Sequence, residues 1–336
     1  MSVKVSIIIP ILNEEKYIRT CLDSILQSDY PRSQMEILLI DGMSEDGTRE
    51  IIVEYQRKYS VVKLLDNIKK IVPVAMNIGI QEAQGDYIVR LDAHAKYPKD
   101  YISSLLNWSI KLNADNVGAV CKTGLKSNTY VAKAIQFVMS DKFGVGNSLF
   151  RLGVTEPLEV DTVPFGFYKK EVFTDIGMYD ERLIRVQDLE FNKRLKKNNG
   201  TIFLVPDVKC TYYPREDIKS FFTNRFQTGR WIILTAYYTK SIKSISIRHL
   251  VPLFFSLMII LGFISGVFSK TYWYTLIAII CVYGTILLTR AYKRKKDFLL
   301  SLHIILAYFI LHFSYGLGSL KGILEVILNK LTGKKE

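Results

Sequence analysis

Short apolar runs alternate with amphipathic segments along the first hundred residues. Four runs are rich in aliphatic residues and have the length of strands: Val3–Ile9, Met35–Ile40, Val61–Leu65 and Tyr87–Leu91. The segments between them keep helical spacing, as Ile18, Leu22 and Ile25 do in the first, and further helices are expected up to Tyr59 and over 71–84. Strands that alternate with helices of this length predict an α/β fold with a mostly parallel central sheet and right-handed crossovers.

The last third of the chain carries three apolar runs without Asp, Glu, Lys or Arg: Leu250–Ser269, Thr271–Thr289 and Phe298–Leu320. Each can cross a hydrocarbon core of about 30 Å as a helix. Before them, residues 218–240 predict an amphipathic helix that lies in the bilayer interface. The sequence therefore predicts an α/β domain at 1–217, an interfacial region at 218–247, a membrane region of about three segments at 248–320 and a basic tail at 321–336.

The net charge of +13 is concentrated near the apolar runs. After residue 240 there are twelve Lys or Arg against three Asp or Glu. Basic groups that flank apolar spans are typical of membrane anchors on the cytoplasmic side, and they argue against a nucleic-acid-binding face on the soluble part. The four cysteines are widely separated, so neither a zinc site nor a disulfide framework is indicated.

Polar side chains follow the predicted strands. Asn13 and Glu14 come after the first and Asp41 after the second, while Asp92 and His94 follow the fourth. The carboxyl ends of parallel strands meet at one edge of a sheet, where open α/β folds bind their ligands. A carboxylate and an imidazole can hold a divalent ion and leave positions open for phosphate oxygens. Singly, Asn13 reads as a helix cap and Asp92 as a turn residue; jointly they favour a nucleotide site. Neither a Gly-x-Gly-x-x-Gly nor a P-loop motif is present.

Four stretches resemble the successive motifs of family 2 glycosyltransferases with the GT-A fold: Pro10-Ile-Leu-Asn13-Glu14-Glu15, Asp41-Gly-Met-Ser-Glu-Asp46-Gly-Thr, Ala75-Met-Asn77-Ile-Gly79-Ile and Arg90-Leu-Asp92-Ala-His94. The resemblance implies that Asp92 and His94 bind Mg²⁺ or Mn²⁺. It also implies a nucleotide-sugar site that consists of Pro10, Asn13, Glu14, Asp41, Asn77, Arg90 and Asp92. His94 stands where the family more commonly has Asp, which keeps a ligand but removes a negative charge.

Two later motifs extend the resemblance. Gln187-Asp188 stands where family 2 enzymes usually carry Glu-Asp, which implies that Asp188 is the general base for the acceptor hydroxyl; a sugar hydroxyl needs such a carboxylate in any case. Gln227-Thr-Gly-Arg230-Trp231 resembles the Gln-x-x-Arg-Trp motif of polysaccharide-synthesising members. There Gln and Arg face the diphosphate and Trp stacks on the acceptor sugar. Away from the motif, Asp188 reads as a helix cap and Arg230-Trp231 as an interfacial anchor.

The resemblance implies an inverting transferase of a bacterial cytoplasmic membrane, with its catalytic domain on the cytoplasmic side. It would move a sugar from a UDP-sugar to a polyprenyl-diphosphate-linked glycan, as in exopolysaccharide or capsule synthesis of the succinoglycan type, beside other assembly enzymes. Polyprenyl-phosphate sugar synthases are alternatives but usually lack Gln-x-x-Arg-Trp, and processive synthases normally have spans on both sides of the catalytic domain. A nucleotidyltransferase would need no acceptor base, and intact Asp92 and Asp188 argue against a non-catalytic scaffold.

The sequence leaves the structure of two segments undecided. Residues 143–165, with three glycines and Arg151, read either as a mobile loop over a bound diphosphate or as a plain surface connection. If Arg290–Lys296 lies inside, a third span would carry Lys321 and Lys330 outside, which the charge bias disfavours. Either that span is re-entrant or residues 321–331 fold back as an interfacial helix.

Overall fold

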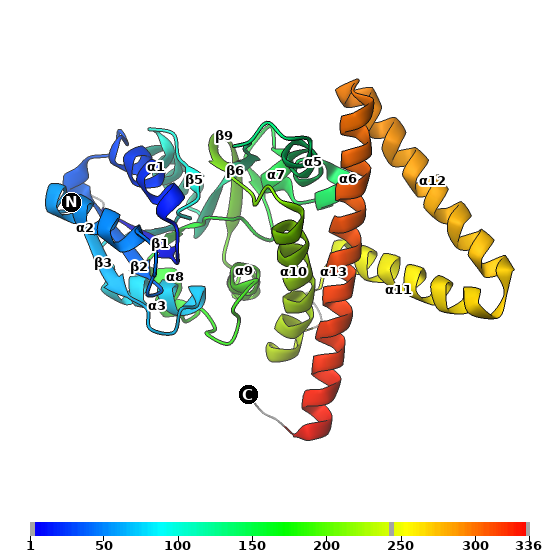
Figure 1. Cartoon of the computed structure of the whole chain (residues 1–336). Coiled ribbons are helices and arrows are strands. Elements are labelled where there is room, and N and C mark those ends of the chain that lie inside the picture. The colour runs from blue at the N-terminus through cyan, green and yellow to red at the C-terminus, as the bar shows by residue number, and fades with distance from the viewer. Residues whose placement is uncertain (1–3, 242–244, 334–336) are drawn as a thin grey trace. The chain divides into compact units, whose positions relative to one another are not determined.

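The computed structural model describes residues 4–241 and 245–333, which form two compact units. The first consists of Met1–Lys122 and Leu149–Tyr213, and the second of Thr123–Ser148 and Pro214–Glu336 (Figure 1). Residues 123–148, inside the predicted 1–217 domain, thus group with the helices that follow Tyr213. Val3 of the first predicted strand, residues 242–244 and the end of the predicted tail, 334–336, lie outside the described residues.

The first half of the first unit is the predicted parallel sheet. The strands β1 (Val5–Ile11), β2 (Met35–Asp41), β3 (Val62–Asp66) and β4 (Tyr87–Arg90) pair in parallel in the order β3-β2-β1-β4. The connections contain α1 (Glu15–Leu26), α2 (Thr48–Lys58) and α3 (Val72–Glu82). The alternation of strands and helices predicted from the apolar pattern is confirmed.

The second half makes the sheet mixed rather than mostly parallel. The added strands are β5 (Ala95–Lys96), β6 (Asn116–Thr123), β7 (Leu158–Glu159), β8 (Phe167–Lys169) and β9 (Ile202–Tyr212), and β8 runs antiparallel to both β4 and β6. β9 pairs antiparallel with β5 and β7. β5, β7 and β8 have two or three residues each, so no local pattern indicates them. Three helices accompany them: α4 (Tyr101–Leu112), α8 (Glu171–Asp175) and α9 (Gln187–Lys197).

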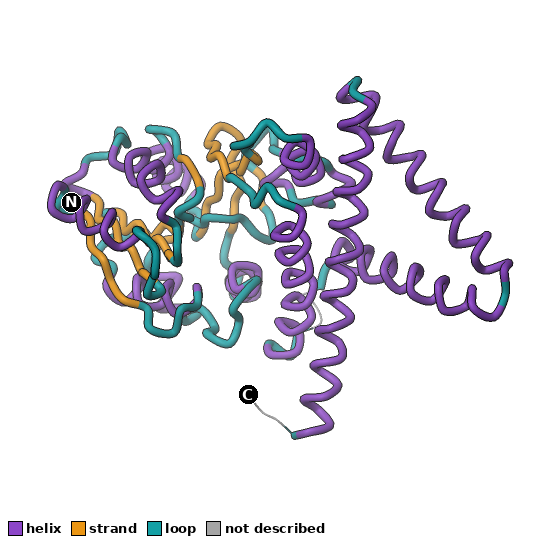
Figure 2. Tube along the Cα trace, viewed as in Figure 1, coloured by secondary structure: helices purple, strands orange, loops and turns teal. Residues whose placement is uncertain are grey.

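Helices cover both faces of the sheet. Alternate residues of β1 point to opposite faces, so both faces are apolar and pack against helices. Ile7 and Ile9 pack in one cluster with Leu22 of α1, Ile52 of α2 and Leu105 of α4. Ile8 packs in the other cluster, with residues of α3 and α9 that include Met76, Ile80 and Phe191. Figure 2 shows this layering of strands and helices in the first unit.

Pro10 does not end the first strand, as the sequence suggested. β1 continues to Ile11, with Pro10 opposite Ile40 of β2, while its pairing with β4 ends earlier, at Ile8 and Arg90. A missing N–H is tolerated where one neighbouring strand has stopped.

Residues 143–165 contain three short elements instead of one long loop. These are α6 (Lys142–Val145), α7 (Leu149–Leu152) and β7.

The second unit is helical. It contains α5 (Tyr130–Met139), α6, α10 (Ile218–Tyr238), α11 (Ile247–Phe268), α12 (Lys270–Lys295) and α13 (Phe298–Thr332). The last three are long and apolar enough to cross a membrane. α13 is one continuous helix of 35 residues, about 52 Å long at 1.5 Å per residue. It shows neither the re-entrant turn nor the folded-back tail that the sequence left as alternatives.

Helices α10 and α13 lie side by side and touch through glycines (Figure 1). A Cβ at Gly318 would lie 1.9 Å from the carbonyl oxygen of Phe226, and one at Gly229 would lie 2.0 Å from that of Tyr315. The hydroxyl of Ser319 also lies 3.3 Å from the carbonyl oxygen of Gly229. Small residues at a crossing let two helix backbones approach, as they do between membrane helices. Gly318 of the third apolar run thus contacts α10, whereas Gly316 approaches Pro252 and Ser256 of α11.

Replacement of Gly318 by alanine should lower the stability of the second unit. The added methyl group overlaps the α10 backbone, so the helices must separate, at a cost of about 1–3 kcal/mol. Gly284→Ala on α12 is the matched control, because a Cβ there meets nothing within 4 Å. The check is the thermal unfolding midpoint of the full chain in detergent. Equal midpoints for the two variants would show that the crossing tolerates a side chain.

Candidate active site

The guanidinium of Arg90 joins two carboxylates that are far apart in the sequence. Arg90 is the last residue of β4 and is 9 % exposed. Its Nη2 lies 3.2 Å from Oδ1 of Asp92, and its Nη1 donates to Oδ1 of Asp188, at the start of α9. Asp92 and Asp188 therefore share one site, and a single buried cation holds both.

Burial and charge act in opposite directions on this triad. Burial works to lower the pKa of Arg90, but the Asp188 and Asp92 carboxylates outweigh it and raise that pKa, so the guanidinium stays protonated. Burial raises the pKa of Asp188, while Arg90 acts to lower it. The Asp188 side chain is 30 % exposed, so it remains open to a reactant. A partly open carboxyl with a raised pKa can accept a proton at its exposed edge.

The segment that carries Asp92 is a tight turn fixed by Tyr97. The backbone N–H of Asp92 donates to the Tyr97 hydroxyl at 2.8 Å, and that hydroxyl lies 3.2 Å from the carbonyl oxygen of Asp92. Tyr97 is 3 % exposed, and β5 follows Asp92 almost directly. The Asp92 side chain is 18 % exposed, while Tyr97 holds its backbone in place.

His94 lies against Glu14. Nδ1 of the imidazole is 3.3 Å from Oε1 of Glu14, whose residue is 7 % exposed, and the ring packs edge-on near Tyr17 and Tyr212. A carboxylate at one ring nitrogen fixes the tautomer and the orientation of the ring, as it commonly does for metal-binding histidines. The structure thus brings Glu14, from the first motif, to His94 of the fourth.

The loops after β1 and β2 are tied together. The backbone N–H of Asn13 donates to the Ser44 hydroxyl at 2.8 Å, and the side-chain oxygen of Asn13 accepts from Glu45 N at 2.9 Å. Asp41 is fully buried, accepts from Ser44, and pairs with Arg49 at 2.6 Å. Pro10 lies one residue before the end of β1. The predicted nucleotide residues of the first two motifs are therefore neighbours.

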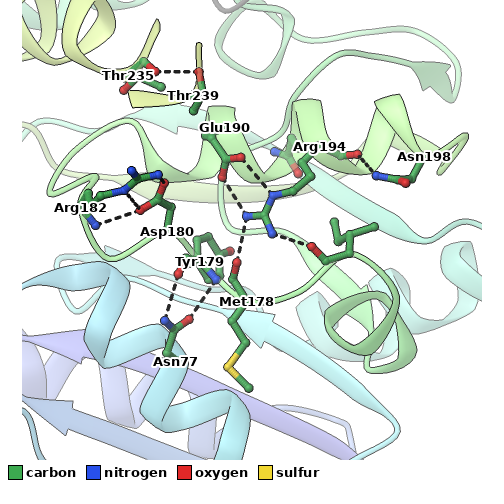
Figure 3. Close-up of polar contacts among 12 residues, drawn as sticks. Asn77, Met178, Tyr179, Asp180, Arg182, Glu190, Arg194, Asn198, Thr235 and Thr239 are labelled. Atoms are coloured by element: carbon green, nitrogen blue, oxygen red, sulfur yellow. Dashed lines mark hydrogen bonds and ion pairs between the residues drawn. The ribbon is translucent and has the colours of Figure 1, made fainter. Parts of the chain in front are cut away.

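Asn77 has a local structural role (Figure 3). Its side chain accepts from the N–H of Tyr179 and donates to the carbonyl oxygen of the same residue, both at 3.0 Å. From the other side, Arg194 of α9 pairs with Glu190 and donates to the carbonyl oxygens of Ile176 and Met178. These bonds fix the segment before α9, and so they fix the helix start that carries Asp188. The hydrogen bonds of the Asn77 side chain go to this segment and not to another predicted site residue.

The Gln-x-x-Arg-Trp residues lie on α10, in the second unit. Arg230 pairs with Glu325 of α13, with Nε and Nη2 each within 2.9 Å of one carboxylate oxygen, and Gln227 lies 3.4 Å from Nη1. Trp231 is 7 % exposed and lies beside the Arg230 guanidinium. Little of the indole is open to a sugar in this conformation, so the stacking role stays a prediction. Sequence reasoning missed Glu325, although a lone acid in an apolar helix is a signal for a functional partner.

Comparisons with known proteins show the family of the chain. The profile of Glycosyl transferase family 2 matches residues 6–177. The dolichyl N-acetyl-alpha-D-glucosaminyl phosphate 3-beta-D-2,3-diacetamido-2,3-dideoxy-beta-D-glucuronosyltransferase of Methanococcus voltae is 28 % identical over 333 residues, which cover 96 % of this chain and 97 % of the relative. Succinoglycan biosynthesis protein ExoA of Rhizobium meliloti (strain 1021) is 32 % identical over 226 residues, 67 % of either chain.

Solved structures show the same fold. The mannosyltransferase PcManGT from Pyrobaculum calidifontis, in complex with GDP-Man and Mn²⁺, superimposes with a TM-score of 0.60 over 97 % of this chain and 88 % of its own, at 15 % identity. The GT-A fold predicted from the motifs is thereby confirmed. The chain belongs to glycosyl transferase family 2 and is a glycosyltransferase.

Proposed function

We propose that this glycosyltransferase moves a sugar, with inversion, from a UDP-sugar to a saccharide carried on a polyprenyl diphosphate. The observation that carries the proposal is the Arg90 bridge, which holds Asp92 and Asp188 in one site. The first carboxylate would serve the donor diphosphate and the second the acceptor. The name of the Methanococcus relative describes transfer to a dolichyl-phosphate-linked sugar, and the Rhizobium relative is named for succinoglycan biosynthesis. Both fit a lipid-linked acceptor.

The residues around Asp92 fit a divalent ion. Asp92 offers a carboxylate and His94 an imidazole with Glu14 at Nδ1, so Nε2 is directed away from that contact. Within 4–241 and 245–333 there is no cluster of three or more His, Cys, Asp or Glu suited to a metal. The protein would thus supply two ligands, and diphosphate oxygens and water would complete the shell of Mg²⁺ or Mn²⁺. When bound, the ion would neutralise charge on the departing diphosphate.

Asp188 would act on the acceptor. In a single displacement it takes the proton from the attacking hydroxyl, the hydroxyl oxygen bonds to the anomeric carbon, and the bond from that carbon to the diphosphate breaks. Arg90 keeps Asp188 and Asp92 in position through its two ends. Asn13 and Glu14 would face the nucleotide from the loop after β1. Asp41, which is fully buried against Ser44 and Arg49, would hold the adjoining loop in place.

Arg230 and Gln227, both on α10 of the second unit, would bind a phosphate group. The Arg230 side chain is 30 % exposed, and its contacts with Glu325 and Gln227 leave one N–H on each terminal nitrogen. Trp231 would stack on a sugar beside them. The three long apolar helices support a membrane location. The basic run 290–296 supports a cytoplasmic catalytic domain in a multi-pass protein of the cytoplasmic membrane.

Membranes that contain the full chain should release a nucleoside diphosphate from a UDP-sugar and label an organic-extractable lipid. We expect EDTA to reduce the labelling to background and Mn²⁺ or Mg²⁺ to restore it. A panel of donors identifies the sugar, and Asp92→Ala is the negative control. Release of pyrophosphate instead of a nucleoside diphosphate would point to nucleotidyl transfer and defeat the proposal. Labelling that persists in EDTA would show that the reaction needs no divalent metal.

A further inference from the structure

A basic pocket lies in the second unit, on residues that none of the motifs include. It has a volume of about 670 Å³ and is open to solvent on one side. Lys142 and Asn147 line it from the segment around α6, Ser246 and Arg248 from the start of α11, and Arg290 from the end of α12. Three segments distant in the sequence thus direct cationic and polar groups to one place.

Three cationic side chains line the pocket. Asp141 is the acid beside it, and its carboxylate is 2 % exposed because it pairs with Arg290 at 2.7 Å, with Arg294 at 2.6 Å and accepts from Tyr308 at 2.5 Å. These pairs lower the pKa of Asp141, against the opposing effect of burial, so it stays ionised and fixes Arg290 at the rim. No acid is among the described lining residues. Asp141 is thus occupied by Arg290 and Arg294, while Lys142 and Arg248 bring further cationic groups to the lining.

The pocket lies at the ends of two candidate membrane spans. Arg248 is the first residue of one span, and Arg290 is near the end of the next. Because the start of one span and the end of the next line the same pocket, both lie on the same side of the membrane. Beyond them, Val251 and Phe254 of α11 and Ile286 of α12 expose more than half of their surface. These apolar faces are where the tails of a lipid would lie if its headgroup entered the pocket.

On the side of the apolar helix faces, packed aromatic side chains form the wall of the pocket. Phe143 lines the pocket, and its ring packs 6.4 Å from that of Tyr283 on α12 and 6.0 Å from that of His312 on α13. The Tyr283 hydroxyl is 2.8 Å from Nδ1 of His312. A Cβ at Gly146 would lie 3.1 Å from the side chain of Arg248, whose Nη1 donates to Asn147 at 3.0 Å. The cation is thus held in place by the pocket's own rim.

We infer that this pocket binds the phosphate of a membrane lipid headgroup. Arginine forks match phosphate oxygens, and basic pockets between membrane helices on the cytoplasmic side bind anionic headgroups. The same chemistry is carried by anionic phospholipids and by prenyl-linked phosphates, and the experiment separates these sources. The inference does not depend on the proposed reaction, since binding is measured without donor sugar or divalent metal.

The test titrates the delipidated full chain, in neutral detergent with EDTA, against geranylgeranyl diphosphate, geranylgeraniol, phosphatidylglycerol and inorganic pyrophosphate. We expect saturable binding of the two phosphate-bearing lipids. Lys142→Gln with Arg248→Gln should weaken it roughly thirtyfold, at about 1 kcal/mol for each cation lost. Lys293→Gln with Lys296→Gln removes the same charge from the end of α12 outside the described pocket lining and should leave the affinity within threefold.

Whichever of geranylgeranyl diphosphate and phosphatidylglycerol binds more tightly identifies the class of lipid that the pocket takes. Lys142→Gln alone, which changes an exposed side chain, should still weaken lipid binding roughly fivefold. This single variant replaces the double variant in the test if the double variant does not fold. Geranylgeraniol or pyrophosphate binding as tightly as geranylgeranyl diphosphate would overturn the inference. Equal weakening by the control pair would overturn it as well.

Discussion

Replacement of Asp188 by asparagine should lower the turnover of sugar transfer by about 10³-fold. The amide has nearly the same shape but cannot take a proton from the acceptor hydroxyl, and a positioned base contributes about 10²–10⁴-fold. The amide oxygen of the new side chain can still accept a hydrogen bond from Arg90, so we expect the donor to bind within about threefold of the original affinity. The measurement is kcat for lipid labelling by the purified full chain, together with titration of the nucleoside diphosphate.

Asp175→Asn is the matched control. Asp175 is an exposed carboxylate at the end of α8, so the same substitution there should leave kcat unchanged. If Asp188 only held Arg90 in place, Asp188→Asn would lower the unfolding midpoint and weaken donor binding together with turnover. A variant that keeps more than a tenth of the turnover would rule out Asp188 as the base.

Replacement of Arg90 by glutamine should destabilise the first unit by about 3–5 kcal/mol and abolish transfer. Removal of one partner from a buried ion pair leaves an uncompensated charge, and here two carboxylates lose the same cation. Arg90→Lys keeps the charge but not the fork that reaches both acids, so it should recover part of the stability and little of the activity. The measurement is the denaturant midpoint of the detergent-solubilised chain.

The stability deficit of Arg90→Gln should depend on pH. The pKa of Asp188 is already raised by burial, and without Arg90 it loses the effect that opposes this rise. The folded variant then binds more protons than the unfolded chain, so its stability falls as pH rises, and the deficit is smaller at about pH 5 than at about pH 8. Arg57→Gln, on an exposed side chain of α2, is the control. A deficit independent of pH would show that charge is not its cause.

The parallel half of the sheet could be predicted because each of its strands is a continuous apolar run followed by a helix of regular spacing. Most of the antiparallel half could not. β8 has three residues, and its place between β4 and β6 depends on contacts with segments about fifty to eighty residues away. Likewise, no structure was predicted for residues 99–142, where α4, β6 and α5 lie. Pairing over such distances leaves no periodicity within a local window.

The motifs gave candidate site residues, but not their arrangement. The structure shows Arg90 between two carboxylates, which the motifs did not predict, because the end of β4 directs its side chain toward the start of α9. Asn77 holds the backbone of Tyr179, and its predicted place beside the donor stays a prediction. Glu325 was not predicted because it lies beyond the third apolar run, which ends at Leu320. A motif gives residue types and order, while side-chain direction follows from tertiary packing.

The close crossing at Gly229 and Gly318 links the Gln-x-x-Arg-Trp motif to the bilayer. Gly229 is part of that motif, and it touches a helix of about 52 Å, much longer than the roughly 30 Å of a hydrocarbon core. A helix of that length adapts to membranes of different thickness by tilting. If α13 spans a membrane, its tilt would carry Arg230 and Trp231 with it, so we expect lipid acyl-chain length to set the angle at which these two side chains meet the membrane surface.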